Sequence, residues 1–308
     1  MTNKIKIKVV GVGGSGSNTV SRMKRSKIKE VEMIVINTDA QDIKKARADV
    51  KIRIGKKTTQ GFGAGMNPEI GKQSAIENYQ EIVEALKGSD MVFITGGEGG
   101  GTFSGAAPIV AQAAKENKAL TVAITTKPFS FEGQVRTRIA EDGIKELKEK
   151  VDALIIISND KLLSILDPNI SVLNAFSFCD NILSQAVQGI SDLITLPGII
   201  NIDFADVKAI MTSSGSALFG IGKAQGENRI EKAALAAINS QLLDFSMKGA
   251  KGVLFNISCE DVSLNEIDQA SKIITNEINP EAKVIFGSVQ NEKLKKGEVK
   301  ITVIATGF

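Results

Sequence analysis

Short apolar runs alternate with amphipathic stretches through the first half of the chain. The runs are rich in Val and Ile, and in the stretches between them apolar residues recur every three or four positions, as in helices. Strand-then-helix repetition predicts a parallel sheet that helices cover on both faces. The expected strands are Ile5–Val10, Met33–Ile36, Met91–Thr95, Leu120–Thr125 and Leu154–Ile157. The expected helices are Asn18–Arg25, Pro68–Leu86, Ala106–Glu116 and Thr137–Lys150.

A longer apolar stripe follows this alternating region. Its members recur at steps of four and three residues, which predicts one long helix that Pro197-Gly198 ends. They are Val172, Phe176, Cys179, Leu183, Ala186, Ile190 and Leu193. Later strands are expected at Ser216–Ile221, Val253–Ile257, Val284–Val289 and Val299–Ala305, with helices at Glu227–Leu242 and Leu264–Ile278. We therefore expect a first α/β domain (residues 1–171), a connecting helix (172–198) and a smaller α+β domain (199–308).

The composition agrees with two domains that fold in water. Of the 308 residues, 43% are hydrophobic and 24% are charged, and the mean hydropathy is +0.04. Lys and Arg number 38 against 35 Asp and Glu, and a net charge of only +3 argues against a nucleic-acid partner. No apolar run approaches the roughly 20 residues that span a bilayer, so we expect no direct membrane insertion and a cytoplasmic protein.

Residue types that the sequence lacks narrow its chemistry. The chain has no His, and Cys179 and Cys259 lie far apart without a CxxC pair. This excludes the usual zinc ligand sets and every proton relay that depends on imidazole. Catalysis must therefore use carboxylates, Lys, Arg, backbone amides or a bound ion.

Glycines concentrate where the expected strands of the first domain end. Gly11-Val-Gly13-Gly-Ser-Gly16 follows a strand, opens a helix and matches GxGxxG, with Asp39 after the next strand. Two interpretations remain open for this motif: a turn whose amides approach a phosphate, or merely a tight strand-to-helix turn. An NAD-dependent oxidoreductase would explain this motif and Asp39, but not the second glycine-rich turn.

That second turn favours a ligand with several phosphates. Thr95–Gly105 holds six glycines and again joins a strand to a helix. Such glycine density costs backbone entropy, which argues against a flexible surface loop. No P-loop lysine motif is present. A third stretch, Gly61–Pro68, could close over the terminal phosphate or be an ordinary loop.

These motifs carry a family resemblance. Gly99–Gly105, GGGTFSG, resembles the GGGTGTG signature of the tubulin/FtsZ family, and further segments resemble that family in the same order. They are Asn37–Gln41, Lys127–Gly133, Ser158–Leu162, Gln188–Gly198, Asn201–Asp206 and Ile304–Phe308. The resemblance implies a Rossmann-like parallel-sheet GTPase domain, a long central helix and a second α+β domain. It also implies a cell-division GTPase that self-assembles head to tail into filaments, with a nucleotide-binding filament scaffold of weak or absent hydrolysis as the alternative.

The resemblance further implies which residues bind GTP and GDP. The phosphate-binding residues would be Gly13, Gly14, Ser15, Gly16 and Ser17 in one turn and Gly100, Gly101, Thr102 and Phe103 in the other. The others would be Asn18 near sugar and base, Ala64 and Gly65 near the terminal phosphate, Glu132 and Arg136 at ribose and phosphates, Phe176 on the guanine face, and Asn159 and Asp180 on the guanine edge. A carboxylate such as Asp180 can accept the N1–H and N2–H₂ pair that guanine presents and adenine lacks. Structural alternatives remain for Phe176 as a core residue, Asp180 as a solvated one and Arg136 as a helix-start cation.

Polar residues after the long helix carry the catalytic expectation. By resemblance, Asn201, Asp203 and Asp206 would act on GTP. The helix from Asp180 to about Thr195 is about 22 Å long at about 1.5 Å per residue, so these acids would not reach the phosphates of their own chain. They would act in trans on a neighbour's GTP, and a head-to-tail contact that repeats without closure gives a filament. Without the resemblance, Asp206 could simply cap a short helix.

Phosphoryl transfer implies a cofactor, and the family implies partners. Mg²⁺ would be bound mainly through phosphate oxygens and water. The principal partner would be another copy of the chain. Membrane adaptors, which bind a C-terminal tail in this family, are possible partners through a tail that the sequence up to Phe308 does not include.

The second glycine turn departs from the family pattern at two positions. Phe103 stands where the family has Gly, and it would require ordinary backbone angles and a ring directed away from the phosphates. Glu98 places a carboxylate near phosphates, so we expect it to turn outward or to pair with a cation.

Overall fold

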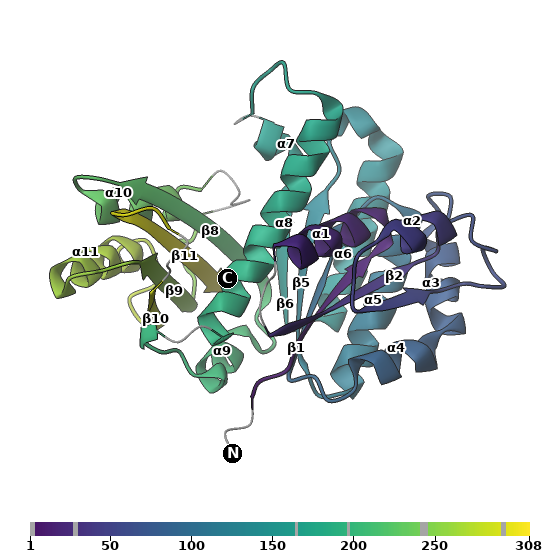
Figure 1. The fold of residues 1–308 in the computed structure, drawn as a ribbon, viewed down its shortest axis with the longest axis horizontal. Coiled ribbons are helices and arrows are strands. Elements are labelled where there is room, and N and C mark those ends of the chain that lie inside the picture. The colour runs from purple at the N-terminus through teal and green to yellow at the C-terminus, as the bar shows by residue number, and fades with distance from the viewer. Residues whose placement is uncertain (1–3, 27–29, 164–165, 196–197, 241–245, 291–293) are drawn as a thin grey trace. The chain divides into compact units, whose positions relative to one another are not determined.

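The computed structural model describes residues 4–26, 30–163, 166–195, 198–240, 246–290 and 294–308. The chain forms two compact units, residues 1–188 and 189–308 (Figure 1). The division between them therefore falls inside the long helix that the apolar stripe predicts.

Six parallel strands form the sheet of the first unit, in the order β3-β2-β1-β4-β5-β6. Their bounds are β1 Ile7–Val12, β2 Val31–Asn37, β3 Val50–Arg53, β4 Met91–Gly97, β5 Leu120–Lys127 and β6 Ala153–Ser158. The predicted parallel sheet is confirmed. β3 was not expected, because a four-residue strand that includes Lys51 and Arg53 carries little apolar signal.

Helices follow most of these strands. Their bounds are α1 Gly13–Arg25, α2 Ala40–Lys45, α3 Pro68–Glu77, α4 Tyr79–Leu86, α5 Gly101–Glu116, α6 Gln134–Lys150 and α7 Asn159–Leu163, with a 3-10 turn at Ser130–Glu132. The single helix expected over residues 68–86 is wrong. The helix breaks at Asn78. The side-chain amide of Asn78 accepts a hydrogen bond from Gly55 N and donates one to Glu81, and such local side-chain bonds compete with helix continuation.

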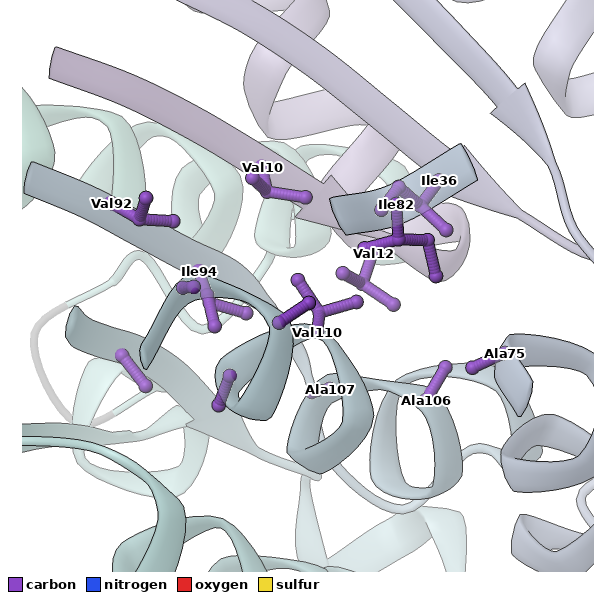
Figure 2. Close-up of a cluster of buried hydrophobic side chains, with 14 of the residues drawn as sticks. Val10, Val12, Ile36, Ala75, Ile82, Val92, Ile94, Ala106, Ala107 and Val110 are labelled. Atoms are coloured by element: carbon purple, nitrogen blue, oxygen red, sulfur yellow. The ribbon is translucent and has the colours of Figure 1, made fainter. Parts of the chain in front are cut away.

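The core of the first unit lies between the sheet and the helices α3, α4 and α5. Figure 2 shows Val10, Val12 and Ile36 of the strands facing Ile82 and Val110 of the helices. All five side chains are buried. This core fixes the strand ends and the helix starts that carry the glycine-rich turns.

Both glycine-rich turns are the first turns of helices. α1 begins at Gly13 and α5 at Gly101, several residues before the expected starts at Asn18 and Ala106. Glycine has low helix propensity, and the sequence pattern therefore places the helix starts too late. The expected phosphate-binding amides are consequently helix N-terminal amides.

The long helix α8, Val172–Thr195, confirms the helix that the apolar stripe predicts. Only part of that stripe is buried. Cys179 and the later members of the stripe are buried, whereas Val172 is 64% exposed and Phe176 is 39% exposed. Pro197, expected to end the helix, lies outside the described residues.

The second unit has a mixed sheet with strand order β8-β11-β9-β10-β7, which confirms the expected α+β class. Its strands are β7 Gly198–Ile200, β8 Gly215–Gln225, β9 Gly252–Cys259, β10 Lys283–Gln290 and β11 Glu298–Thr306. Its helices are α9 Phe204–Met211, α10 Arg229–Ile238 and α11 Leu264–Thr275. The expected helix end at Leu242 lies outside the described residues. Among the helices that the structure describes, none is both long enough and apolar enough to cross a bilayer.

Candidate nucleotide-binding site

A cavity of about 300 Å³ lies at the carboxyl ends of β1, β4 and β5, where parallel α/β sheets bind ligands. The predicted binding residues that line it are Gly13, Gly14, Ser15, Ala64, Gly65, Gly100, Gly101, Thr102, Phe103, Glu132, Arg136, Asn159, Phe176 and Asp180. All of them belong to the first unit. The fold thus brings residues from six separate segments of the chain to one place.

Helices α1 and α5 begin at this cavity with unused N-terminal amides. The N-caps of α1 and α5 are Val12 and Gly100, neither helix has a side-chain cap, and neither has an acidic residue in its first turn. The first N–H groups of a helix have no partner within the helix, and its dipole favours an anion there. Two such N-termini at one cavity are suited to a ligand with several phosphates.

The third glycine-rich stretch lies against the second. A Cβ atom on Gly101 would come within 2.7 Å of Asn67 N and 2.9 Å of Ala64 Cβ, so only glycine permits this contact. Asn67 caps α3 by accepting a hydrogen bond from Glu69 N. Ala64 and Gly65 are therefore held at the cavity by an ordered turn.

A buried carboxyl group also lines the cavity. Asp180 Oδ1 accepts a hydrogen bond from Ser15 Oγ at 3.1 Å, and Oδ2 lies 3.9 Å from Arg22 Nε. Burial raises the pKa of Asp180 to about 6, although the Ser15 hydroxyl and the Arg22 guanidinium oppose this shift. At neutral pH the group is a carboxylate with acceptor capacity facing the cavity, and the alternative of a solvated helix residue does not hold.

Phe176 and Asn159 complete this end of the cavity. The Phe176 ring is partly exposed and packs edge-on against Phe129, with ring centroids 5.2 Å apart, so it is not a core residue. Asn159 is buried at the start of α7, and its Oδ1 has no hydrogen-bond partner among the described residues. A flat apolar face and an unpaired amide oxygen are groups that a purine base can satisfy.

Glu132 and Arg136 form an ion pair at the cavity wall. Arg136 Nη1 donates to Glu132 Oε2, and Phe129 N donates to Glu132 Oε1 at 2.9 Å. The Glu132 carboxylate is largely buried by these contacts. The ion pair with Glu132 therefore orients Arg136 at the cavity wall.

Gly16, Ser17 and Asn18 are the predicted binding residues that do not line this cavity. A Cβ on Gly16 would lie 2.5 Å from Thr95 O, and Ser17 Oγ donates to Gly13 O, so both residues serve the packing and the first turn of α1. Asn18 lines an adjoining groove that shares Phe176 and Asp180 with the cavity.

Several cavity residues were not predicted from the sequence. They are Val12, Met66, Gly97, Glu98, Thr126, Pro128 and Cys179. Gly97 is the last residue of β4 and Thr126 the second-to-last residue of β5, so the rule that ligands bind at strand ends could have found them. Arg22, beside Asp180, lies seven residues after Ser15, which places both on one face of α1.

The structure explains both departures in the second glycine turn. Phe103 has ordinary helical backbone in α5, and its buried ring lies over Gly96, where a Cβ would come within 2.1 Å of it. Glu98 neither turns outward nor pairs with a cation, contrary to expectation. Its carboxyl is buried and accepts a hydrogen bond from Ser104 Oγ, and burial raises its pKa to about 8. Both departures are therefore compatible with phosphates in the cavity.

Asn201, Asp203 and Asp206 belong to the second unit and do not line the cavity. Asp203 is the N-cap of α9 but makes no capping hydrogen bond through its side chain. Asp206 lies within the first turn of α9, so the interpretation of this residue as the cap is wrong. Its carboxylate is about half exposed, with Oδ1 3.8 Å from Lys283 Nζ.

The fold and the cavity define an α/β nucleotide-binding protein with a second α+β unit, and comparisons with known proteins identify its family. Residues 6–167 match the model of the Tubulin/FtsZ family GTPase domain, and residues 215–308 match that of the FtsZ family C-terminal domain. The chain therefore belongs to the Tubulin/FtsZ family. Members of the FtsZ family are filament-forming cell-division GTPases, and GTP hydrolysis is the activity of this chain.

Solved structures agree with this assignment. An empty FtsZ dimer of M. jannaschii is 44% identical, with a TM-score of 0.95 over 100% of this chain and 89% of that one. A W319Y mutant of the same organism's FtsZ is also 44% identical, with a TM-score of 0.94 over 99% and 91% of the two chains. CetZ2 of Haloferax volcanii, a GTPγS-bound protofilament, is 20% identical with a TM-score of 0.84 over 98% and 92%, and shares the fold.

Proposed function

We propose that the cavity binds GTP, with the phosphates at the N-termini of α1 and α5 and the guanine beside Asp180. The observation that carries this proposal is the pair of helices that begin at one cavity without side-chain caps or acidic first turns. A triphosphate supplies the several anionic groups that two such N-termini can hold.

Guanine would be selected at the Asp180 end. The Asp180 carboxylate would accept the N1–H and N2–H₂ groups of guanine, which adenine does not present. The exposed face of Phe176 would stack on the base, and Asn159 would hydrogen-bond its edge. Among the described residues no cluster of three or more acidic, Cys or His side chains could hold a metal. A Mg²⁺ ion would be held mainly by phosphate oxygens and water and would neutralise phosphate charge when bound.

Hydrolysis would use acids from a second copy of the chain. Asp203 and Asp206 lie in the second unit, and both carboxylates are exposed to solvent. Groups that act on a neighbour's nucleotide must be accessible in this way. With Asn201 they would orient the attacking water and accept its proton. The protein would then hydrolyse GTP only where one copy contacts the next, and repetition of this contact builds the homopolymer. The dimeric structure of the M. jannaschii relative supports such self-association.

Other expectations about partners and location form part of this proposal. The small net charge supports a protein that binds no nucleic acid. We place the protein in the cytoplasm, without direct membrane insertion and with adaptors as possible membrane links.

A mixing experiment tests the shared site. Asp206→Ala should bind GTP normally but hydrolyse it at least about a hundredfold more slowly, because its cavity is intact and its acid is missing. Asp180→Ala should fail to hold GTP but still offer its acids. Mixed together, the two variants should recover part of the phosphate release that neither shows alone.

Asp268→Ala removes an exposed acid from α11 and serves as the matched control with unchanged turnover. Full-rate hydrolysis by dilute monomers, or a mixture no more active than its parts, would contradict catalysis in trans.

A further inference from the structure

Glu98 is a buried carboxyl group that the proposed GTP site does not yet use. It follows β4 directly and is only 6% exposed. Its Oε1 has no hydrogen-bond partner among the described residues, whereas its Oε2 accepts a bond from Ser104 Oγ. Burying a polar atom without a hydrogen-bond partner costs free energy, so the position of Glu98 calls for a physical explanation.

The contact with Ser104 links Glu98 to the phosphate-binding turn. Ser104 Oγ also accepts a hydrogen bond from Gly99 N at 3.1 Å. Gly99 has a φ of 88°, which favours glycine, and it immediately precedes Gly100, the N-cap of α5. Glu98 thus orients the Ser104 hydroxyl, and Ser104 holds the Gly99 peptide in place. The orientation of this peptide sets the direction of the amides that follow.

Helix α6 is shaped to admit this pair. A Cβ atom on Gly143 would lie 2.5 Å from Glu98 Oε2 and 2.9 Å from Ser104 Cβ. Glycine in the middle of a helix is unfavourable, so its presence here is explained by the close approach of the carboxyl group. Three elements therefore surround the Glu98 carboxyl group: the end of β4, the first turn of α5 and the middle of α6.

Among the residues that the structure describes, no charged group compensates the ionisation of Glu98. Burial raises the pKa of Glu98 to about 8, and the hydrogen bond from Ser104 partly opposes this shift. No charged residue of α5, α6 or β5 contributes to it. On α6, Arg136 pairs with Glu132 and Glu146 pairs with Lys72. Glu98 is accordingly uncharged at neutral pH and ionises only in alkaline solution.

We propose that Glu98 is a positioning residue for nucleotide binding: its carboxyl group fixes Ser104, which holds Gly99 so that the amides at the start of α5 point at the phosphates. Ionisation would place an unpaired charge in this buried position, beside the anionic ligand, and would disturb the turn. This inference rests on the proposed binding of GTP in the cavity.

The experiment measures the GTP dissociation constant and the kinetic constants between pH 6 and 9. In the unaltered protein, GTP affinity should fall above pH 8 by up to about tenfold per pH unit. Glu98→Gln keeps the size and an acceptor for Ser104 but cannot ionise, so its affinity should match that of the unaltered protein at pH 7 and remain flat to pH 9. Glu98→Ala should weaken GTP binding about tenfold at pH 7, with KM changing more than kcat.

Two controls separate the possible explanations. Glu149→Gln, at an exposed position near the end of α6, should keep the alkaline loss of affinity. Ser104→Ala should weaken binding as Glu98→Ala does, and the double variant should be no worse than either one, because both act through one contact.

The same alkaline loss in Glu98→Gln, or full affinity in both Glu98→Ala and Ser104→Ala, would overturn the role of Glu98. The glutamine variant keeps the test decisive even where the alanine variants do not fold. Asp180→Ala, measured alongside, reports on the cavity itself: if it binds GTP normally the proposed site fails, whereas loss of binding there with normal Glu98 variants refutes only this inference.

Discussion

Two groups of helix starts in this molecule contrast with each other. α2, α3 and α11 begin with Asp39, Asn67 and Ser263, whose side chains accept hydrogen bonds from the first amides of their own helix. α1 and α5 begin with Val12 and Gly100, and leave those amides unused at the cavity. A side-chain cap stabilises a helix by about 1 kcal/mol. α1 and α5 forgo this stability and keep their N-termini available for a ligand at the cavity.

The largest effect is expected from removing the side chain that anchors an uncapped start. Phe103 lies in the first turn of α5 and buries its ring in the core over Gly96. Phe103→Ala should lower the free energy of unfolding by about 3–5 kcal/mol, because it leaves a cavity that the sheet cannot close. Urea unfolding followed by circular dichroism measures this loss. A change below about 1 kcal/mol would show that the ring does not anchor the turn.

A second variant converts α5 from one kind of helix start to the other. Gly100 has extended backbone angles, and a Cβ there would meet nothing within 4 Å, so Gly100→Asp can cap α5 without strain. The carboxylate should occupy the free amides and repel phosphates, which should weaken GTP binding about a hundredfold or more. Thermal stability without nucleotide should be equal or higher.

Gly100→Ala offers no capping group and is the matched control. Equal GTP affinity in the Asp and Ala variants, measured by isothermal titration, would show that the start of α5 does not bind phosphate.

The two ends of the cavity should differ in their response to pH. Below pH 7 the phosphate end does not titrate, because its amides carry no ionisable group and Glu98 stays uncharged there, whereas Asp180, with a pKa of about 6, gains a proton as the pH falls through 6. A protonated carboxyl group cannot accept both guanine N–H groups, so the preference for GTP over ATP should decrease about tenfold per pH unit below 6.

In the folded state without nucleotide the sign is opposite. Because the pKa of Asp180 is raised, its contribution to stability is present below the ordinary value of 3.8 and is lost as the pH rises to about 6. Nucleotide competition at pH 5 and pH 7.5 checks the prediction for binding, and a preference for GTP that does not change with pH would remove Asp180 from guanine selection.

The smallest effect is expected at a capped helix. Ser263 forms a capping box with Glu266 at the start of α11, in the second unit. Ser263→Ala should cost about 1 kcal/mol of unfolding free energy and leave GTP affinity unchanged. Calorimetry together with nucleotide titration would test both parts. A loss of GTP affinity in this variant would show that a distant cap affects the cavity. The absence of caps on α1 and α5 would then no longer explain nucleotide binding.

The sequence predicted the secondary structure best where the apolar pattern is long. The strand over residues 120–125 lies within β5, and the stripe from Val172 lies within α8. Short elements such as β3 and α7 were missed, because four or five residues contain too little periodicity. The break at Asn78 was also missed, since it depends on Gly55, which is distant in sequence.

The candidate site shows the same limit. The glycine turns and Asp180 were identified from spacing and family resemblance, and the structure brings them to one cavity. Glu98 illustrates what spacing cannot predict. Its residue type suggested an exposed or paired charge, yet Ser104 and Gly143 enclose it, and burial leaves it uncharged at neutral pH.

The alternation of strands and helices, the position of the glycine-rich turns and the membership of a GTPase family could all be read from the residues alone, because these properties depend on local pattern and on residue types. Which helix starts lack a cap, which charges are buried and which residues meet at the cavity became visible only in the folded molecule. Burial and contact between distant segments set these properties, and the linear order of residues records neither.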